Sequence, residues 1–297
     1  MRLSYLLVVM LVLLLQWPTS ASSQSLRPMR ETSRSDAAVR VEPPSVTVQR
    51  ELAYGTHTRQ RFDVYLPASA RNAPVILFVH GGGWAFGDKG GRGVIENKAA
   101  YWLAKGYVVV STNYRLRPEA APLEQARDVA FALARVQKLA PQWQADPSRV
   151  VLMGHSSGAH LVALVGASSV LWRQAGARPP VGVVSLDTAA LDVPQAMAKP
   201  ALPGLYARAF GDGEADWVAA SPYHQLTADG VPMLAVCSSR RREVCAQGQA
   251  FQRKAATMGV RVEVLPQDLS HRQVNQELGL PSAYTDAVDR FIDALVK

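Results

Sequence analysis

The sequence is poor in cysteine: Cys237 and Cys245 are the two cysteines among its 297 residues. Two thiols without neighbouring histidines do not make a metal ligand set, so the sequence predicts no metal site. The two residues lie close together in a chain for which we predict an export signal, described below. We therefore expect a disulfide between them, formed in an oxidising compartment. Two free thiols, one of them buried at a strand end, are the alternative.

Tracts of positive charge are also missing, although the net charge is +8. The arginines are scattered, and no Lys/Arg tract is interleaved with aromatic residues. The densest group is Arg240-Arg241-Arg242, which reads as a solvated loop. The sequence therefore predicts no nucleic-acid binding, and the basic charge indicates at most an attraction to anionic surfaces or acidic polymers.

Long apolar runs are absent except at the start of the chain. Arg2 precedes an apolar run from Tyr5 to Leu15, and small residues follow up to Ala21. This pattern is typical of a secretory signal peptide over residues 1–21, because the run is short for a membrane span. An uncleaved anchor is the alternative. We expect an exported protein, periplasmic or extracellular, with no stable membrane insertion after cleavage.

The rest of the chain has the composition of a globular protein, with 48% hydrophobic and 19% charged residues. Residues 22–43 are rich in Ser, Arg and Pro and predict a flexible segment. Residues 44–297 alternate strand and helix patterns, which predicts one α/β domain with a mostly parallel sheet and helices on both faces. The expected strands are 46–50, 61–66, 75–79, 107–111, 150–153, 181–186, 233–237 and 261–265, the first two antiparallel; the expected helices are 94–105, 122–140, the one after Ser156, 246–258 and 283–296. Residues 193–222 look irregular and are long for a loop, so they could form a small cap.

A serine stands between one of these strands and the next helix, in Gly154-His155-Ser156-Ser157-Gly158. A short strand, a G-x-S-x-G turn and a helix are the context of a nucleophile elbow. The two glycines remove Cβ atoms that would clash in so sharp a turn. A Ser/Gly turn that merely enters a helix is the alternative.

A run of glycines follows the buried strand 75–79, in His80-Gly81-Gly82-Gly83-Trp84. Successive glycines leave backbone N–H groups unobstructed, which an oxyanion hole requires. We expect Gly82 and Gly83 to be its donors, with Ser157 of the elbow as a third.

These motifs have a family resemblance. The order HGGGW, Asn113-Tyr114-Arg115, GHSSGAH, Ala220-Ser221-Pro222-Tyr223 and Ser270-His271 resembles the α/β-hydrolase fold in its hormone-sensitive-lipase-like and carboxylesterase branch, over about residues 60–297. The resemblance implies a small-molecule ester or amide substrate and no cofactor. It also implies a base that follows the last strand, and His271 is in that position. Trp84, Tyr114 and Trp217 are expected to line the substrate pocket.

The acid of a Ser-His-acid triad is where the chain departs from this branch. The resemblance expects a carboxylate in the loop after strand 233–237, but Arg241 takes that position, and an arginine would repel an imidazolium. Asp187, at the end of strand 181–186, is our first candidate, because it resembles the acid of pancreatic-type lipases. Glu243 is the second candidate and Asp268 a third.

The sequence thus predicts a serine hydrolase of carboxylic esters with Ser156, His271 and Asp187 as its triad. Two alternatives stay open. The same triad could cleave amides, as an arylformamidase, amidase or peptidase does, or the chain could be a binding protein on a decayed hydrolase scaffold.

Overall fold

The computed structural model describes residues 46–91, 93–199 and 204–297. These residues belong to one compact unit, Glu42–Lys297. The predicted signal peptide (1–21), the segment 22–43 and the domain start at residue 44 lie outside the described residues. None of the described helices is both long and apolar enough to cross a bilayer.

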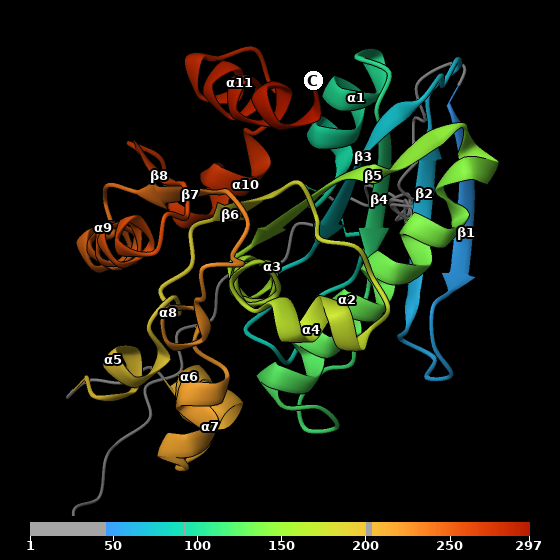
Figure 1. Ribbon diagram of the computed structural model, residues 1–297. Helices are drawn as coiled ribbons and strands as arrows, with labels where there is room; N and C mark the ends of the chain where they lie inside the picture. Colours follow the sequence, from blue (N-terminus) through green and yellow to red (C-terminus); the bar gives the residue numbers. More distant parts are fainter. Residues whose placement is uncertain (1–45, 92, 200–203) are drawn as a thin grey trace, which may run out of the picture. The chain divides into compact units, whose positions relative to one another are not determined.

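The described residues build an eight-stranded sheet with the order β1-β2-β4-β3-β5-β6-β7-β8 (Figure 1). β1 pairs antiparallel with β2, and β2 with β4, while all other neighbours are parallel. The strands are β1 Thr47–Ala53, β2 Arg61–Leu66, β3 Ala73–Val79, β4 Val108–Thr112, β5 Ala145–His155, β6 Gly182–Leu186, β7 Met233–Ser238 and β8 Val262–Gln267. Both the predicted mostly parallel sheet and its antiparallel opening pair are confirmed.

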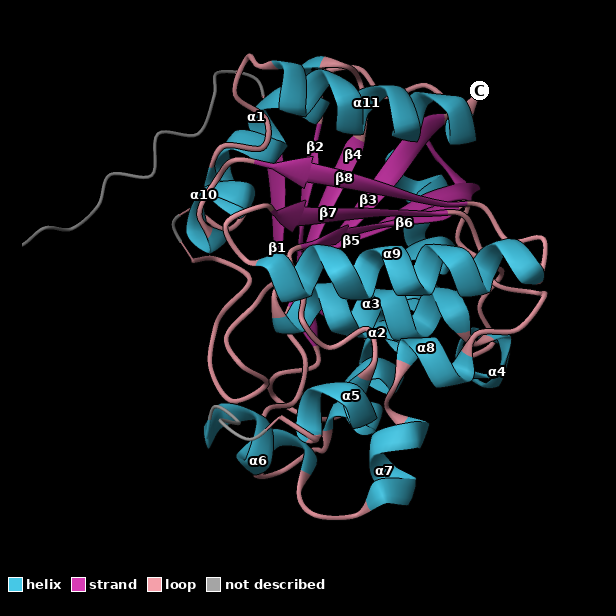
Figure 2. Cartoon of the chain, turned by 90° about the vertical axis from the view of Figure 1, so that its left-hand side faces the viewer, coloured by secondary structure: helices cyan, strands magenta, loops and turns pink. Residues whose placement is uncertain are grey.

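The strands at the centre of this sheet contain apolar runs because both faces of the sheet are covered. In β3, Val75, Leu77 and Val79 pack into one core, while Ile76 and Phe78 pack into the other. α2, α3, α4 and α9 cover the first face, and α1, α10 and α11 cover the second (Figure 2). Their bounds are α1 Glu96–Ala104, α2 Pro122–Leu139, α3 Ser157–Ala167, α4 Ser169–Gln174, α9 Arg242–Thr257, α10 His271–Gln276 and α11 Ala283–Val296.

The carboxyl ends of the parallel strands meet at one edge of the sheet. Val79 at the end of β3 is in register with Gly154 of β5, and His155 with Leu186 at the end of β6. The glycine loop, the serine turn and the loop after β6 therefore all start from neighbouring positions. Ligand sites of open α/β sheets form at this edge.

Two predictions about the helices need correction. Residues 193–222 are not simply irregular, because they contain α5 Val193–Met197, α6 Gly204–Phe210 and α7 Glu214–Ala219, and α8 Pro222–Gln225 begins at their end. Helices this short have weak sequence patterns and form chiefly through tertiary packing. The helices α4 and α10 were not predicted either. For α10, Ser270 and Gln273 form a capping box at its start, which is a signal visible in the sequence.

Candidate active site

The turn that carries Ser156 is as sharp as the sequence implies. Ser156 lies between β5 and α3 with φ 58° and ψ −118°, a conformation that L-residues rarely adopt. A Cβ atom on Gly154 would lie 2.5 Å from the carbonyl oxygen of Gly158, and one on Gly158 would lie 2.2 Å from that of Val79. Both glycines are therefore required by sterics, and the turn is held with the serine at the edge of the sheet.

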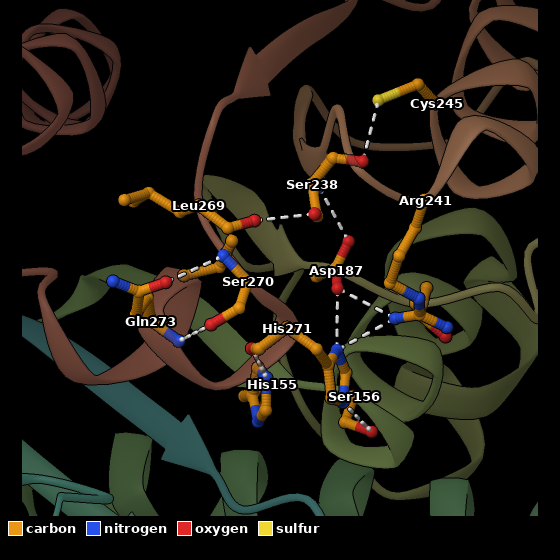
Figure 3. A network of polar contacts seen from close by, with 12 residues as sticks. His155, Ser156, Asp187, Ser238, Arg241, Cys245, Leu269, Ser270, His271 and Gln273 are labelled. Carbon is orange, nitrogen blue, oxygen red and sulfur yellow. Dashed lines mark hydrogen bonds and ion pairs between the residues drawn. The ribbon is translucent and has the colours of Figure 1, made fainter.

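His271 lies beside this serine although 115 residues separate them in the chain. Its Nε2 is 3.1 Å from Ser156 Oγ, and its Nδ1 is 2.6 Å from Asp187 Oδ2 (Figure 3). His271 is the first residue of α10, directly after the Ser270 cap, so the capping box fixes the backbone from which the imidazole projects.

A second histidine supports the imidazole of His271. The ring of His155 lies 4.5 Å from that of His271, centroid to centroid, and its Nε2 donates to the His271 carbonyl oxygen over 2.9 Å. Burial, and then the neighbouring His271 ring, lower the pKa of His155 to about 3. His155 is thus neutral and acts here as a fixed donor.

Asp187 directly follows β6 and is fully buried. Its Oδ1 accepts the backbone N–H of Ser238 over 2.8 Å, and its Oδ2 lies 2.7 Å from Arg241 Nη1. Burial raises the pKa of Asp187, but hydrogen bonds from His271 and Ser238 and the charge of Arg241 outweigh it, so that the pKa is lowered overall. The carboxylate is ionised and oriented toward the imidazole.

The two other candidate acids lie elsewhere. Glu243 is exposed in the first turn of α9, and within the described residues no hydrogen bond joins it to His271. Asp268 is an exposed partner of Arg240, with Oδ1 2.8 Å from its Nε. Of the three carboxylates, the structure brings Asp187 to the imidazole.

The glycine loop passes against the serine turn. A Cβ atom on Gly81 would lie 3.0 Å from Ser156 Cβ, so the loop and the serine are in van der Waals contact. Gly82 and Gly83 have φ 135° and 59°, and a Cβ atom on Gly82 would lie 2.1 Å from the carbonyl oxygen of Phe86. In the described part of the chain, the N–H groups of Gly82, Gly83 and Ser157 have no hydrogen-bond partner. Ser157 directly follows Ser156, and Gly82 and Gly83 directly follow Gly81, which adjoins the serine.

Buried aromatic rings hold this loop from behind. The His80 ring stacks on Tyr114 at 4.6 Å, and the Tyr114 hydroxyl donates to the His80 carbonyl oxygen over 3.0 Å. Burial lowers the pKa of His80 to about 4, and its Nδ1 donates to the Gly81 carbonyl oxygen over 2.8 Å. Tyr114 is fully buried, so in this position it supports the loop and presents no surface to solvent.

The helix α6, within residues 193–222, contacts the glycine loop through aromatic side chains that the sequence did not reveal. Trp84, 2% exposed, packs edge-to-face on Tyr206 and Phe210 of α6 at 5.4 and 4.8 Å. Trp217 on α7 is partly buried and donates to the Gly211 carbonyl oxygen over 2.9 Å. No motif marks Tyr206 or Phe210, because residues 193–222 carry no pattern that fixes their partners.

The predicted disulfide between Cys237 and Cys245 is present. It joins the end of β7 to the first turns of α9 and so closes the loop that carries Arg241. Within the described ranges, no group of three or more His, Cys, Asp or Glu side chains could hold a metal ion.

Comparisons with known proteins agree with this architecture. The family model described as BD-FAE matches residues 62–175, which include the glycine loop and Ser156. The chain is 24% identical to esterase B from Lactobacillus Rhamnosis over 86% of this chain and 87% of that one, with a TM-score of 0.66. It is 20% identical to a truncated carbohydrate esterase from gut microbiota over 84% and 96%, with a TM-score of 0.72. The fold is the α/β-hydrolase fold, as predicted.

Curated relatives match a shorter part of the chain. A probable isoprenylcysteine alpha-carbonyl methylesterase of Arabidopsis thaliana is 31% identical over 117 residues, 39% of this chain and 24% of the relative. A kynurenine formamidase of Danio rerio is 31% identical over 135 residues, 44% of this chain and 42% of the relative. The chain thus spans about a quarter of the length of the first of these relatives.

Proposed function

We propose that this protein is a serine hydrolase that cleaves carboxylic esters of small or medium acyl or aryl groups. The observation that carries the proposal is the connected set of contacts from Ser156 Oγ to His271 and from His271 to Asp187, at 3.1 and 2.6 Å. A serine hydroxyl needs an oriented base to become a nucleophile, and these contacts supply one.

In the first half of the proposed reaction, Ser156 Oγ forms a bond to the ester carbonyl carbon while its proton passes to His271 Nε2. The N–H groups of Gly82, Gly83 and Ser157 bind the resulting oxyanion. The imidazolium returns the proton to the alkoxide, the bond to the alcohol breaks, and an acyl-enzyme remains. A water molecule then repeats these steps and releases the acid.

The walls of the substrate pocket are part of the proposal. Trp217 lies on α7, and the buried Trp84 of the glycine loop packs on Tyr206 and Phe210 of α6, so a change in α6 is expected to alter acyl or alcohol preference through Trp84 and the loop. Tyr114 would act through His80 and the loop. Export is proposed as well, and the Cys237–Cys245 disulfide supports it because such bonds persist in oxidising compartments.

The test is Ser156→Ala with a short p-nitrophenyl ester. We expect turnover to fall by at least about 10⁴-fold, since loss of a serine nucleophile removes the covalent route, while the melting temperature changes little. A fluorophosphonate probe should label the natural protein and not the variant. Full turnover in the variant would exclude Ser156 as the nucleophile, and failure of the natural protein to react would favour a decayed scaffold.

An arylformamidase activity on the same triad is the second candidate. It is favoured by the similarity to kynurenine formamidases, because the chain is 31% identical to a kynurenine formamidase and 31% identical to a methylesterase over the matched residues. Parallel turnover of acyl esters, N-formylkynurenine and aminoacyl amides by the natural protein would separate the candidates.

A further inference from the structure

A cationic side chain lies where the imidazole and the carboxylate meet. Arg241 precedes α9 as its N-terminal cap residue, and its Nη1 lies 2.7 Å from Asp187 Oδ2 and 2.8 Å from His271 Nδ1 (Figure 3). Since Nδ1 is itself 2.6 Å from the same Oδ2, the three atoms form a closed triangle. The arginine that occupies the position expected for an acid is therefore in direct contact with both partners of the base.

The hydrogen atoms in this triangle cannot satisfy every contact. Arg241 Nη1 can only donate, whereas Asp187 Oδ2 can accept from two donors. A neutral imidazole has one N–H: if Nδ1 donates to Asp187, it cannot also accept from Arg241. Because Asp187 is ionised, it takes both donors. The contact between Arg241 and His271 is then one between two N–H groups, and it becomes one between two positive charges when the imidazole is protonated.

We propose that Arg241 is a positioning residue that sets the pH range of hydrolysis. Its fixed charge opposes a second positive charge on His271, so the imidazole remains an unprotonated base at lower pH than it would beside a neutral residue. Without the charge of Arg241, the carboxylate of Asp187 would stabilise the imidazolium with no opposing positive charge in contact with the ring. This inference rests on the proposed function, because it assigns the acid limb of the rate profile to His271.

The other groups around His271 do not replace this charge. His155 on β5 is neutral, and burial raises the pKa values of Tyr206 on α6 and Tyr284 on α11, so both are uncharged as well. Arg272 is exposed on α10. Lys98 on α1, whose pKa burial lowers to about 7, acts on His155 and is the same in every variant considered. Among the residues that the structure describes, Arg241 and Asp187 are the charged groups whose atoms form polar contacts with the ring.

The size of the effect follows from the distance. Two unit charges about 4 Å apart repel each other in bulk water by the equivalent of roughly 0.7 pH units, and by more where water is partly excluded. The Arg241 side chain is 30% exposed and Asp187 is fully buried, so screening is incomplete. We expect Arg241→Gln to raise the midpoint of the acid limb of kcat/KM by about one pH unit.

Three substitutions separate charge from shape. Arg241→Gln removes the charge and keeps an N–H donor, Arg241→Met removes both, and Arg241→Lys keeps the charge. We expect the Gln and Met variants to move the midpoint upward together, and the Lys variant to stay close to the natural protein. Arg242→Gln is the matched control, because it removes the same charge from the next residue, which is exposed.

The measurement is kcat/KM for a short p-nitrophenyl ester from pH 5 to 9, together with a ¹⁵N NMR titration of the His271 ring in the full protein. The titration reports imidazole protonation without turnover, and it remains informative if a variant is slow. A midpoint in Arg241→Gln at or below that of the natural protein, by both readouts, would overturn the role of Arg241. Activity retained by Ser156→Ala would instead overturn the proposed function, so the two failures are distinguishable.

Discussion

Replacement of Asp187 by asparagine tests the geometry of the site most directly. Asp187 Oδ2 accepts from His271 Nδ1 and from Arg241, and its Oδ1 accepts from the Ser238 backbone N–H over 2.8 Å. An asparagine has a single acceptor oxygen. If that oxygen faces His271, the amide NH₂ faces the Ser238 N–H; if the NH₂ faces His271, the imidazole proton moves to Nε2 and blocks acceptance from Ser156. In each orientation, the NH₂ group of the asparagine faces at least one other hydrogen-bond donor.

We therefore expect Asp187→Asn to lower kcat by about 10⁴-fold, the cost typical of an imidazole held in the wrong tautomer. The assay is steady-state turnover of a short p-nitrophenyl ester, with circular dichroism to establish that the variant is folded. Glu243→Gln is the matched control and should leave the rate close to that of the natural protein, because Glu243 is exposed. A large loss in Glu243→Gln with little loss in Asp187→Asn would transfer the role to Glu243 and refute this reasoning.

Two further predictions concern the stability of the fold. A Cβ atom on Gly158 would lie 2.2 Å from the Val79 carbonyl oxygen, so we expect Gly158→Ala to lower the free energy of unfolding in urea by about 3 kcal/mol or more. Gly176→Ala, whose Cβ atom would meet nothing within 4 Å at φ +73°, should cost about 1 kcal/mol, and equal losses would contradict the steric argument. Burial lowers the pKa of Lys98 from 10.5 to about 7, so between these values the folded state binds fewer protons than the unfolded state and Lys98 makes stability rise with pH. As the pH falls from 10 to 7, the free energy of unfolding of Lys98→Met should therefore rise relative to that of the natural protein, by up to about 5 kcal/mol. A difference in unfolding free energy that does not depend on pH would contradict this.

The order of strands and helices could be predicted from the sequence because the buried strands contain short apolar runs. β3 is apolar from Ala73 to Val79 since it packs into two cores at once, and no loop residue interrupts it. The cap helices could not be predicted in this way. α6 spans seven residues and α7 six, so they depend on tertiary packing. The partner of α6 is Trp84, which lies more than a hundred residues earlier in the chain.

The candidate site was predictable to different degrees for its parts. The serine turn and the glycine loop are local, and steric demands on Gly154 and Gly158 leave a trace in the sequence. The candidate acid leaves a weaker trace, which is the resemblance of Asp187 to the acid of pancreatic-type lipases. Asp187 and Glu243 both follow strands that end at the same edge of the sheet, and sequence spacing does not say which side chain points toward His271. The direction depends on the backbone of Asp187, whose φ of 57° is a conformation that Asp adopts more readily than most residues.

The position of the candidate acid, Asp187, and the presence of Arg241 are structurally connected, because the two side chains contact each other. With the carboxylate after β6, the end of β7 no longer supplies a charge, but it still supplies the Ser238 N–H that fixes Asp187 Oδ1. The loop that follows is then free to carry a cation, and the disulfide between Cys237 and Cys245 closes that loop around Arg241. The substitution Arg241→Asp would place two carboxylates beside one imidazole, and the negative charges of these two carboxylates repel each other. We therefore expect hydrolysis to persist with neutral or cationic residues at position 241 as long as Asp187 is present. A carboxylate at position 241 should be compatible with hydrolysis only in the Asp187→Asn background.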